Sequence, residues 1–252
     1  MSRTLVLEAA ARTDIGRVRE TNQDALLVRN DLGLFVVADG MGGHAAGDLA
    51  ASIAVTTLEG LYDDPEITQP RAAPGSPADA LARLVAAVKN ANSRIQEAAA
   101  KDRSKRGMGT TVVAALACGD TVCLAHIGDS RIYRLRDRQL EQLTDDHTVG
   151  AEWVKQGAAV ELANNLTMGR ALTRALGTRP TVEVSARQET VLPGDVLLLC
   201  SDGVHGVVSP DELTGILLEL GDLASGADRL ITRANDGGGP DNSTALLVRW
   251  SL

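Results

Sequence analysis

Four aspartates in this chain stand beside glycine or proline at the edge of an apolar stretch. Asp39, Asp129 and Asp202 each adjoin a glycine at the end of such a stretch, and Asp241 follows a Gly-Gly-Gly-Pro run directly before the last one. Carboxylates that converge repel one another unless a cation lies between them. Ligands that are all oxygen favour Mg²⁺ or Mn²⁺ over zinc or copper. Because Asp-Gly pairs are also common in turns, the pattern predicts either a shared metal site or ordinary turns.

The apolar stretches that carry these aspartates have the length and composition of strands buried in a sheet. We expect strands at 32–38, 110–118, 121–127, 130–137, 182–188, 195–201 and 244–250. Helices are expected at 45–59, from Pro77 to about residue 100, from the capping box that begins at Ser209, and over 222–235. Helices that come in pairs among antiparallel strands predict an α+β layered domain rather than a βαβ winding.

Size and composition exclude several classes of protein. The 252 residues suit one large domain, and we expect a single domain over 1–252. A net charge of −8 and an aromatic content of 2% argue against a nucleic-acid partner. Three cysteines without a C-x-x-C motif indicate reduced thiols rather than a zinc site. No apolar run is long enough for a membrane span and no secretion signal is evident, so we expect no membrane partner and a cytoplasmic location.

Other phosphate-handling chemistries lack their motifs. No cysteine has an arginine six residues downstream, as the loop of cysteine phosphatases requires, and no Asp-x-Asp pair offers an aspartyl nucleophile. Neither G-x-S-x-G nor G-x-x-x-x-G-K-[ST] occurs. The glycine run from Gly40 ends at His44 instead of the lysine that a phosphate loop needs. These glycines are better explained by a backbone carbonyl that approaches a metal, or by a turn.

Six short motifs follow one another along the chain: Arg19–Asp24, Asp39–His44, Gly109–Thr111, Gly128–Arg131, Ser201–Gly203 and Asp241–Asn242. Together they resemble the metal-dependent type 2C serine/threonine protein phosphatase family in its compact bacterial form. The resemblance covers nearly the whole chain. It implies a four-layer α-β-β-α sandwich, with two antiparallel sheets flanked by helix pairs. It also implies an enzyme that hydrolyses phosphoserine and phosphothreonine in proteins.

The resemblance implies a role for each matching residue. Asp39 would bridge two Mn²⁺ or Mg²⁺ ions, with the Gly40 carbonyl on one of them, and Asp202 and Asp241 would hold the other. Asp129, together with Asp202, would offer a third and weaker metal site. Two such cations lower the pKa of a shared water enough to give hydroxide near neutral pH. That hydroxide would attack phosphorus in line, without a covalent intermediate.

Four further residues would surround these ligands. Asp24 would order metal-bound waters, with Gln23 and Asn242 beside it. Gln23 stands where many members of the family have an acid, which lowers the local negative charge by one. Arg19 would bind the substrate phosphate through bidentate contacts, although pairing with a nearby acid such as Glu20 is the alternative.

The general acid is an open question. Animal members of the family carry histidine after the Asp-Gly pair, and this chain has Met41 there. His44 is either a substitute acid or a structural residue. His126 lies in an apolar stretch and is expected in the core, whereas His147 either caps a helix or touches substrate. His205 follows Asp202 closely and is expected beside the metal ligands.

The polar segment 144–178 corresponds by position to the variable flap of the family. Its Arg170 and Arg174 either contact phosphoproteins or are solvated. The expected partners are phosphorylated proteins and a cognate serine/threonine kinase. Two alternatives stay open: a catalytically silent adaptor of the same fold that binds phosphoproteins, and a metal-free protein whose Asp-Gly pairs are only turns.

Overall fold

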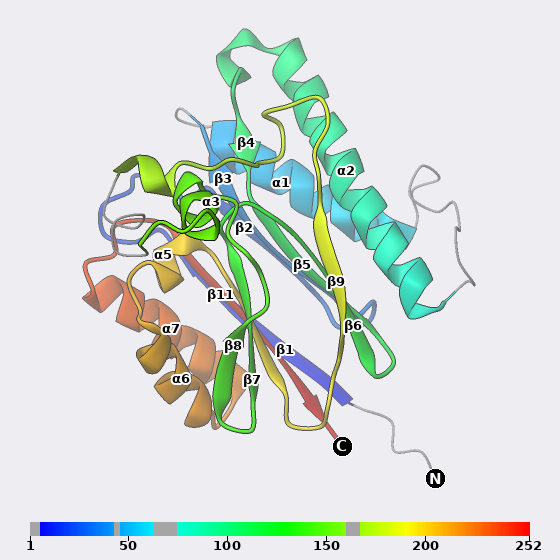
Figure 1. The fold of residues 1–252 in the computed structure, drawn as a ribbon, viewed down its shortest axis with the longest axis vertical. Helices are drawn as coiled ribbons and strands as arrows, with labels where there is room; N and C mark the ends of the chain where they lie inside the picture. Colours follow the sequence, from blue (N-terminus) through cyan, green and yellow to red (C-terminus); the bar gives the residue numbers. More distant parts are fainter. Residues whose placement is uncertain (1–5, 43–45, 63–74, 160–166) are drawn as a thin grey trace.

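Two antiparallel sheets form the centre of the molecule (Figure 1). The computed structural model describes residues 6–42, 46–62, 75–159 and 167–252. In strand order, the first sheet consists of β1 (Val6–Asp14), β11 (Ser243–Ser251), β10 (Val196–Cys200), β7 (Arg131–Arg136) and β8 (Gln139–Gln142). The second consists of β2 (Asp24–Arg29), β3 (Leu34–Met41), β5 (Val112–Cys118), β6 (Thr121–Ile127) and β9 (Ser185–Thr190), with the short β4 (Gly109–Thr110) paired to β3.

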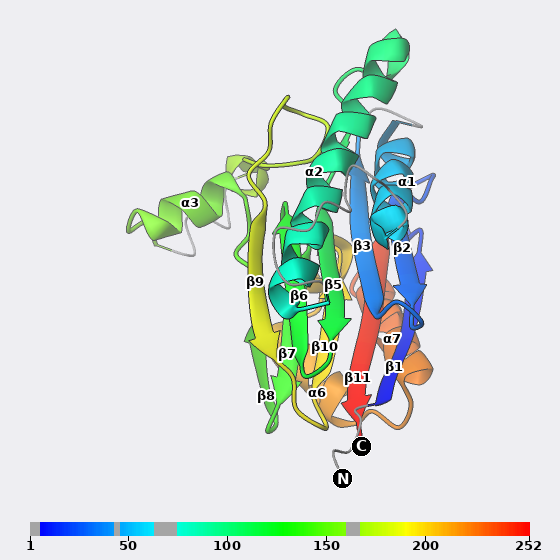
Figure 2. The ribbon, with the colours of Figure 1, turned by 90° about the vertical axis from the view of Figure 1, so that its right-hand side faces the viewer.

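Helix pairs cover the outer faces of the two sheets. Helices α1 (Ala46–Glu59) and α2 (Pro77–Lys101) pack on the second sheet, and α6 (Pro210–Leu218) and α7 (Leu223–Asp236) pack on the first (Figures 1 and 2). Three clusters of buried apolar side chains fill the spaces between these layers. The layers therefore run helix, sheet, sheet, helix, and the predicted α+β four-layer sandwich is confirmed.

Strand β3 shows why the apolar stretches were readable as strands. Successive side chains point to opposite faces of a sheet. Leu34 and Val36 pack toward α1 and α2, whereas Phe35 and Val37 pack against the other sheet, and all four are fully buried. A strand buried on both faces is apolar at every position, so the stretch is continuous and ends sharply where the polar site begins.

The strand expected at 110–118 is divided into the short β4 and β5. Three further strands were not predicted, and all three lie at sheet edges. β1 and β8 border the first sheet and β2 borders the second. Edge strands of this kind keep exposed positions: β1 carries Glu8 and Arg12, and β8 reads Gln-Leu-Glu-Gln. In β1 and β8 the apolar residues are too sparse to give the continuous stretch by which the central strands were recognised. β2 does contain an unbroken apolar run of four residues, Ala25–Val28, which is shorter than the stretches assigned as strands.

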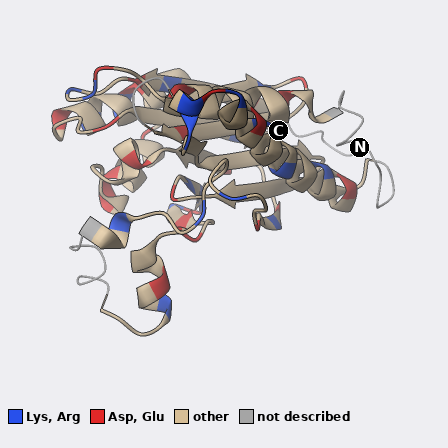
Figure 3. Cartoon of the chain, turned by 90° about the horizontal axis from the view of Figure 1, so that it is seen from above, with Lys and Arg blue, Asp and Glu red and all other residues tan. Residues whose placement is uncertain are grey.

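The segment 144–178 contains more regular structure than its sequence indicates. Thr148 caps α3 (Val149–Lys155) by accepting a hydrogen bond from the Ala151 amide at 3.2 Å, and a 3₁₀ helix, η3, spans Thr167–Arg170. Figures 2 and 3 show α3 projecting away from the sandwich. The strand expected at 182–188 begins three residues later, at Ser185. No described helix is both long enough and apolar enough to cross a membrane.

Candidate metal centre

Strand ends from both sheets meet at one edge of the sandwich, where a cavity of about 260 Å³ opens. Asp39 arrives at the end of β3, and Asp202 follows β10 as the first residue of the short helix α5 (Asp202–His205). Asp129 and Asp241 come from the turns before β7 and β11. These four aspartates line the cavity together with Arg19, Gln23, Gly40 and Asn242. The structure therefore brings together residues that lie up to 222 positions apart in the sequence.

Threonines hold the backbone of Asp39 and leave its side chain to the cavity. The Asp39 amide donates to Thr111 Oγ1 at 3.1 Å, and its carbonyl accepts from the Thr111 amide and from Thr110 Oγ1, both at 2.9 Å. Burial, followed by repulsion from the neighbouring aspartates, raises the pKa of Asp39 well above its usual range. The fold thus sets the position of the Asp39 carboxyl group through its backbone.

Gly40 permits α1 to start directly on the end of β3. A Cβ atom at this position would lie 2.1 Å from the carbonyl oxygen of Gly47 and 2.7 Å from that of Gln23. The Gly40 amide donates to the Gln23 carbonyl at 3.1 Å. No larger residue fits here, so the Gly40 carbonyl is held at the cavity wall by packing on two sides.

Asp202 faces other carboxylates. Its side chain lies within hydrogen-bonding reach of the Asp39 carboxyl group, and its Oδ1 atom is buried with no partner among the described residues. Burial and the charge of Asp241 raise the pKa of Asp202, and burial and Asp202 in turn raise the pKa of Asp129 to about 7. Carboxylates this close cannot all be charged unless a cation compensates them.

Arg19 is the cation that the chain itself places at the cavity. Its Nη2 donates to Asp241 Oδ2 at 2.5 Å, and its side chain is 53% exposed. The predicted alternative partner, Glu20, is therefore not the one it contacts. The flap supplies a second guanidinium, since Arg170 of η3 also lines the cavity.

Asp24 is not among the lining residues, and its side chain connects the end of β10 to β11. Its Oδ2 accepts hydrogen bonds from Ser201 Oγ and Thr244 Oγ1, both at 2.7 Å, while Oδ1 is buried without a partner among the described residues. Burial outweighs these hydrogen bonds and raises the pKa of Asp24 to about 6. No sequence pattern indicates Ser201 and Thr244 as its partners, because they lie 177 and 220 positions away.

Asn242 fixes the loop that carries Arg19. Its side-chain amide donates to the carbonyls of Ile15 and Thr21, both at 2.9 Å, and its Oδ1 accepts from the Gln23 amide at 2.9 Å. All three contacts are to backbone, and the side chain is 5% exposed. Asn242 thus holds the loop at both ends.

His44, the candidate general acid, lies outside the residues that the structure describes.

The donor set fits Mg²⁺ or Mn²⁺. Apart from the Thr111 hydroxyl and the Met41 thioether, the side-chain donors on the cavity wall are carboxylates or amides, and the Oδ1 atoms of Asp24 and Asp202 are buried without a partner among the described residues. Among the described residues, no three His, Cys, Asp or Glu side chains converge on one point as they stand. Ions of this type commonly take only one or two protein carboxylates each and complete their shell with water. A shared site with few carboxylates per ion satisfies both observations.

Comparison with known proteins agrees with this geometry. Residues 16–230 match the family model described as protein phosphatase 2C. The chain is 41% identical over 246 residues to the serine/threonine protein phosphatase PstP of Mycobacterium tuberculosis, covering 97% of this chain and 45% of that protein. It is 37% identical over 250 residues to the serine/threonine phosphatase stp of Listeria monocytogenes, covering 98% and 97%.

Solved structures show the same fold. The Mycobacterium tuberculosis phosphatase PstP/Ppp superimposes with a TM-score of 0.88 at 38% identity, over 98% of this chain and 100% of that one. A catalytic domain of PstP in complex with two manganese ions gives a TM-score of 0.86 at 38% identity, over 99% and 100%.

The chain belongs to the protein phosphatase 2C family, as the sequence motifs predicted. The relatives that it matches along nearly their whole length include bacterial proteins named as serine/threonine phosphatases, such as that of Listeria monocytogenes. It spans 45% of the length of its mycobacterial relatives.

Proposed function

We propose that this chain is a metal-dependent hydrolase that removes phosphate from phosphoserine and phosphothreonine in proteins. The observation that carries the proposal is the set of mutually repelling carboxylates around one cavity, with Arg19 at its rim. The names of the bacterial relatives support the reaction, and the manganese-bound relative supports the cofactor. Residues 1–252 would form one catalytic domain, with 144–178 as its flap.

The residues that would hold the ions are those predicted from the motifs. Asp39 and the Gly40 carbonyl, with Asp202 and Asp241, would hold two Mn²⁺ or Mg²⁺ ions, and Asp129 with Asp202 would hold a third. When bound, such ions lower the pKa of water toward neutrality and polarise the phosphate group. Asp24 would accept hydrogen bonds from waters around the ions while it holds Ser201 and Thr244 in place.

The chain's own contribution is to bind and orient the phosphate group. Arg19 presents a planar fork of N–H donors that matches two phosphate oxygens, and its half-exposed side chain has room to turn from Asp241 toward a substrate. Among the described lining residues there is no cysteine, serine or histidine. Thr111 Oγ1 shares a hydrogen bond with Ser130 Oγ at 2.7 Å and accepts one from the Asp39 amide. This lining favours direct attack by water over a covalent intermediate.

The physiological partners would be phosphoproteins and the serine/threonine kinase that produces them. His44, three residues after Met41 in the sequence, remains a candidate general acid. The competing proposal is an adaptor that binds phosphoproteins without hydrolysing them. The presence of all four predicted metal aspartates on the cavity wall favours the enzyme.

The test is turnover of a phosphothreonine peptide by the purified chain. With Mn²⁺ present we expect release of inorganic phosphate, its loss after EDTA treatment, and its return when Mn²⁺ is added back. Peptide binding without phosphate release would support the adaptor. Turnover that survives exhaustive chelation would refute the metal-dependent mechanism.

A further inference from the structure

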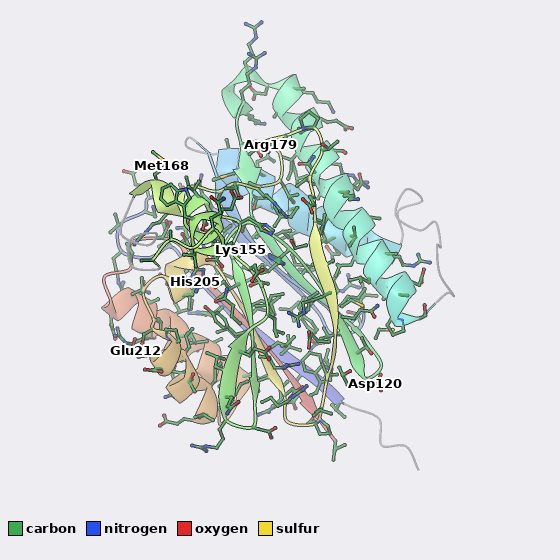
Figure 4. All side chains as sticks on the ribbon, in the orientation of Figure 1. Asp120, Lys155, Met168, Arg179, His205 and Glu212 are labelled. Carbon is green, nitrogen blue, oxygen red and sulfur yellow. The ribbon has the colours of Figure 1, made fainter. Side chains whose placement is uncertain are left out.

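Two histidines outside the carboxylate set hydrogen-bond to the backbone of the Gly128-Asp129 turn. His147 Nδ1 accepts a hydrogen bond from the Gly128 amide at 3.1 Å, and the His147 amide donates to the Gly128 carbonyl at 2.9 Å. His205 Nε2 contacts the Asp129 carbonyl at 2.9 Å (Figure 4 labels His205). The backbone that carries Asp129 is therefore fixed by side chains from two other segments.

The hydrogen bonds of His147 define its tautomer. Because the Gly128 amide donates to Nδ1, the ring proton lies on Nε2, which donates to Ser185 Oγ at 3.0 Å. The ring of His126 stacks on it with centroids 4.7 Å apart, and burial and this neighbour lower the pKa of His147 to about 3. His147 is thus a neutral imidazole with both nitrogens in use, joining the turn to the first residue of β9.

The backbone of His147 also contacts the later part of the flap. Its carbonyl accepts from the Thr173 amide at 2.8 Å, and the next residue, Thr148, pairs with Leu172 as an isolated antiparallel bridge. Leu172 lines the cavity, as does Arg170 two residues earlier. A single residue therefore contacts the metal-site turn through its ring and amide, and the cavity-lining part of the flap through its carbonyl.

Gly128 has little freedom to move independently of His147. Its φ is +99°, and a Cβ atom there would lie 2.6 Å from Thr111 Cγ2. The turn is thus held between Thr111 and His147. Removing the His147 ring would leave the buried Gly128 N–H without its acceptor, and a buried donor without an acceptor is costly. The turn would relax, and Asp129 would move with it.

We infer that His147 is a positioning residue that couples residues 168–176 of the flap to Asp129, so that these residues and Asp129 move together. This inference deepens the proposed function, because it assigns to one residue the link between the flap and the weakest predicted metal site. Asparagine at 147 places an oxygen where histidine has Nδ1, and so keeps the acceptor for Gly128 while losing the contact with Ser185.

The test compares four variants: H147A, H147N, S185A and N92A. Asn92 is the matched control, because it anchors the end of the flap by accepting from the Gly177 amide at 2.8 Å and donating to the Arg179 carbonyl at 3.0 Å, without touching Gly128. Amide exchange is measured on peptides that cover 127–131 and 168–176. Mn²⁺ binding is measured by calorimetry, with D129N identifying the step that depends on Asp129.

We expect H147A to speed exchange in both peptides and to weaken the Asp129-dependent Mn²⁺ step about tenfold. H147N should restore slow exchange at 127–131 and bring Mn²⁺ affinity to within about threefold of the wild type. S185A should leave 127–131 slow. N92A should speed exchange in the flap peptide alone, with Mn²⁺ binding unchanged.

Three results would overturn the inference: normal exchange at 127–131 in H147A, H147N no better than H147A, or N92A loosening the turn as much as H147A. If H147A does not fold, amide exchange at 127–131 in H147N and S185A is compared with that in N92A. Exchange is read without metal, so failure of the wild type to bind Mn²⁺ would refute the proposed function while the coupling is still decided by exchange.

Discussion

Strand β10 has an aspartate at each end, and the two have opposite surroundings. Asp195, just before the strand, is 2% exposed and receives two hydrogen bonds from the Arg136 guanidinium and one from the Leu192 amide. Asp202, just after the strand, faces the Asp39 carboxyl group and keeps a buried oxygen without a described partner. The same residue type on the same strand is neutralised at one end and left in electrostatic conflict at the other.

The difference separates stability from function. A buried carboxylate paired with arginine has its charge compensated within the fold. A carboxylate held against other carboxylates destabilises the fold until something outside the chain compensates it. The core strands supply the rigidity that keeps Asp202 in this position. The end of β10 at Asp202 therefore has the properties of a binding site, and the end at Asp195 those of a structural contact.

The largest expected effect comes from D202N. Replacing this carboxylate by an amide should lower kcat for a phosphothreonine peptide by at least about a thousandfold, because the shared metal site loses one of its charges. The thermal midpoint measured in EDTA should stay equal or rise, since one repelling charge is removed. Steady-state kinetics with saturating Mn²⁺, together with calorimetry, measures both.

The matched control for D202N is D195N, the same change at the other end of β10. It should keep kcat within about twofold of the wild type per folded molecule, because Asp195 lies away from the cavity. If D202N kept wild-type turnover, the assignment of this end of the strand to catalysis would be wrong.

D195N should instead show its effect in stability. Its amide cannot accept both hydrogen bonds from Arg136, so one of the two contacts between a buried side chain and a guanidinium that is 26% exposed is broken. We expect the free energy of unfolding to fall by about 3 kcal/mol. Urea titration at neutral pH measures it, and a loss no greater than that of D202N would remove the contrast between the two ends.

How far the sequence predicts this arrangement follows from the range of each signal. Continuous apolar stretches made the central strands visible, and the Asp-Gly pairs marked Asp39, Asp129 and Asp202. The partner of Asp195 could not be found in this way, because Arg136 lies 59 positions away and nothing local distinguishes it from other arginines. Sequence patterns predicted where the strands end and which acids stand there. They did not predict which acids are paired.

The same limit applies around the cavity. The Arg19–Asp241 contact joins the two ends of the chain, and the family motifs placed both residues at the site without predicting that they touch. His147 was left between a cap and a substrate contact, since its ring partner Gly128 becomes visible only when the strands are in register. The edge strands β1 and β8 were missed because exposed positions interrupt their apolar pattern, whereas the apolar run of β2, Ala25–Val28, is unbroken but short.

Stability in EDTA should depend on pH with opposite sign for the two kinds of carboxylate. The pKa of Asp129 is raised to about 7 and that of Asp24 to about 6, both mainly by burial. The folded state therefore binds more protons than the unfolded state between about pH 4 and pH 7, and stability falls as pH rises through that window. For paired acids such as Asp31, a hydrogen bond from Arg29 lowers the pKa. Their contribution to the stability of the fold is therefore lost only when pH falls below about 4.

The predicted loss between pH 6 and pH 7.5 is on the order of 2 kcal/mol. Denaturant unfolding in EDTA at the two pH values measures it, and D129N should show a smaller change because one of the titrating groups is gone. A wild-type protein that becomes more stable over this range would contradict the unpaired state of the cavity carboxylates.

The smallest effect should come from S201A, which removes one hydrogen bond from a carboxylate behind the cavity. Ser201 Oγ donates to Asp24 Oδ2 at 2.7 Å, and Thr244 Oγ1 donates to the same oxygen, so one donor remains. Because these hydrogen bonds lower the pKa of Asp24 against the effect of burial, their partial loss should raise that pKa further. We expect a stability loss of about 1 kcal/mol and a few-fold higher Mn²⁺ concentration for half-maximal activity at pH 7, with kcat at saturating Mn²⁺ nearly unchanged. A Mn²⁺ titration of activity at pH 7 and pH 8 measures this. The S201A defect should shrink at the higher pH, where Asp24 is charged in both proteins, and a defect equally large at both values would mean that Ser201 acts on the shape of β10 and not through Asp24.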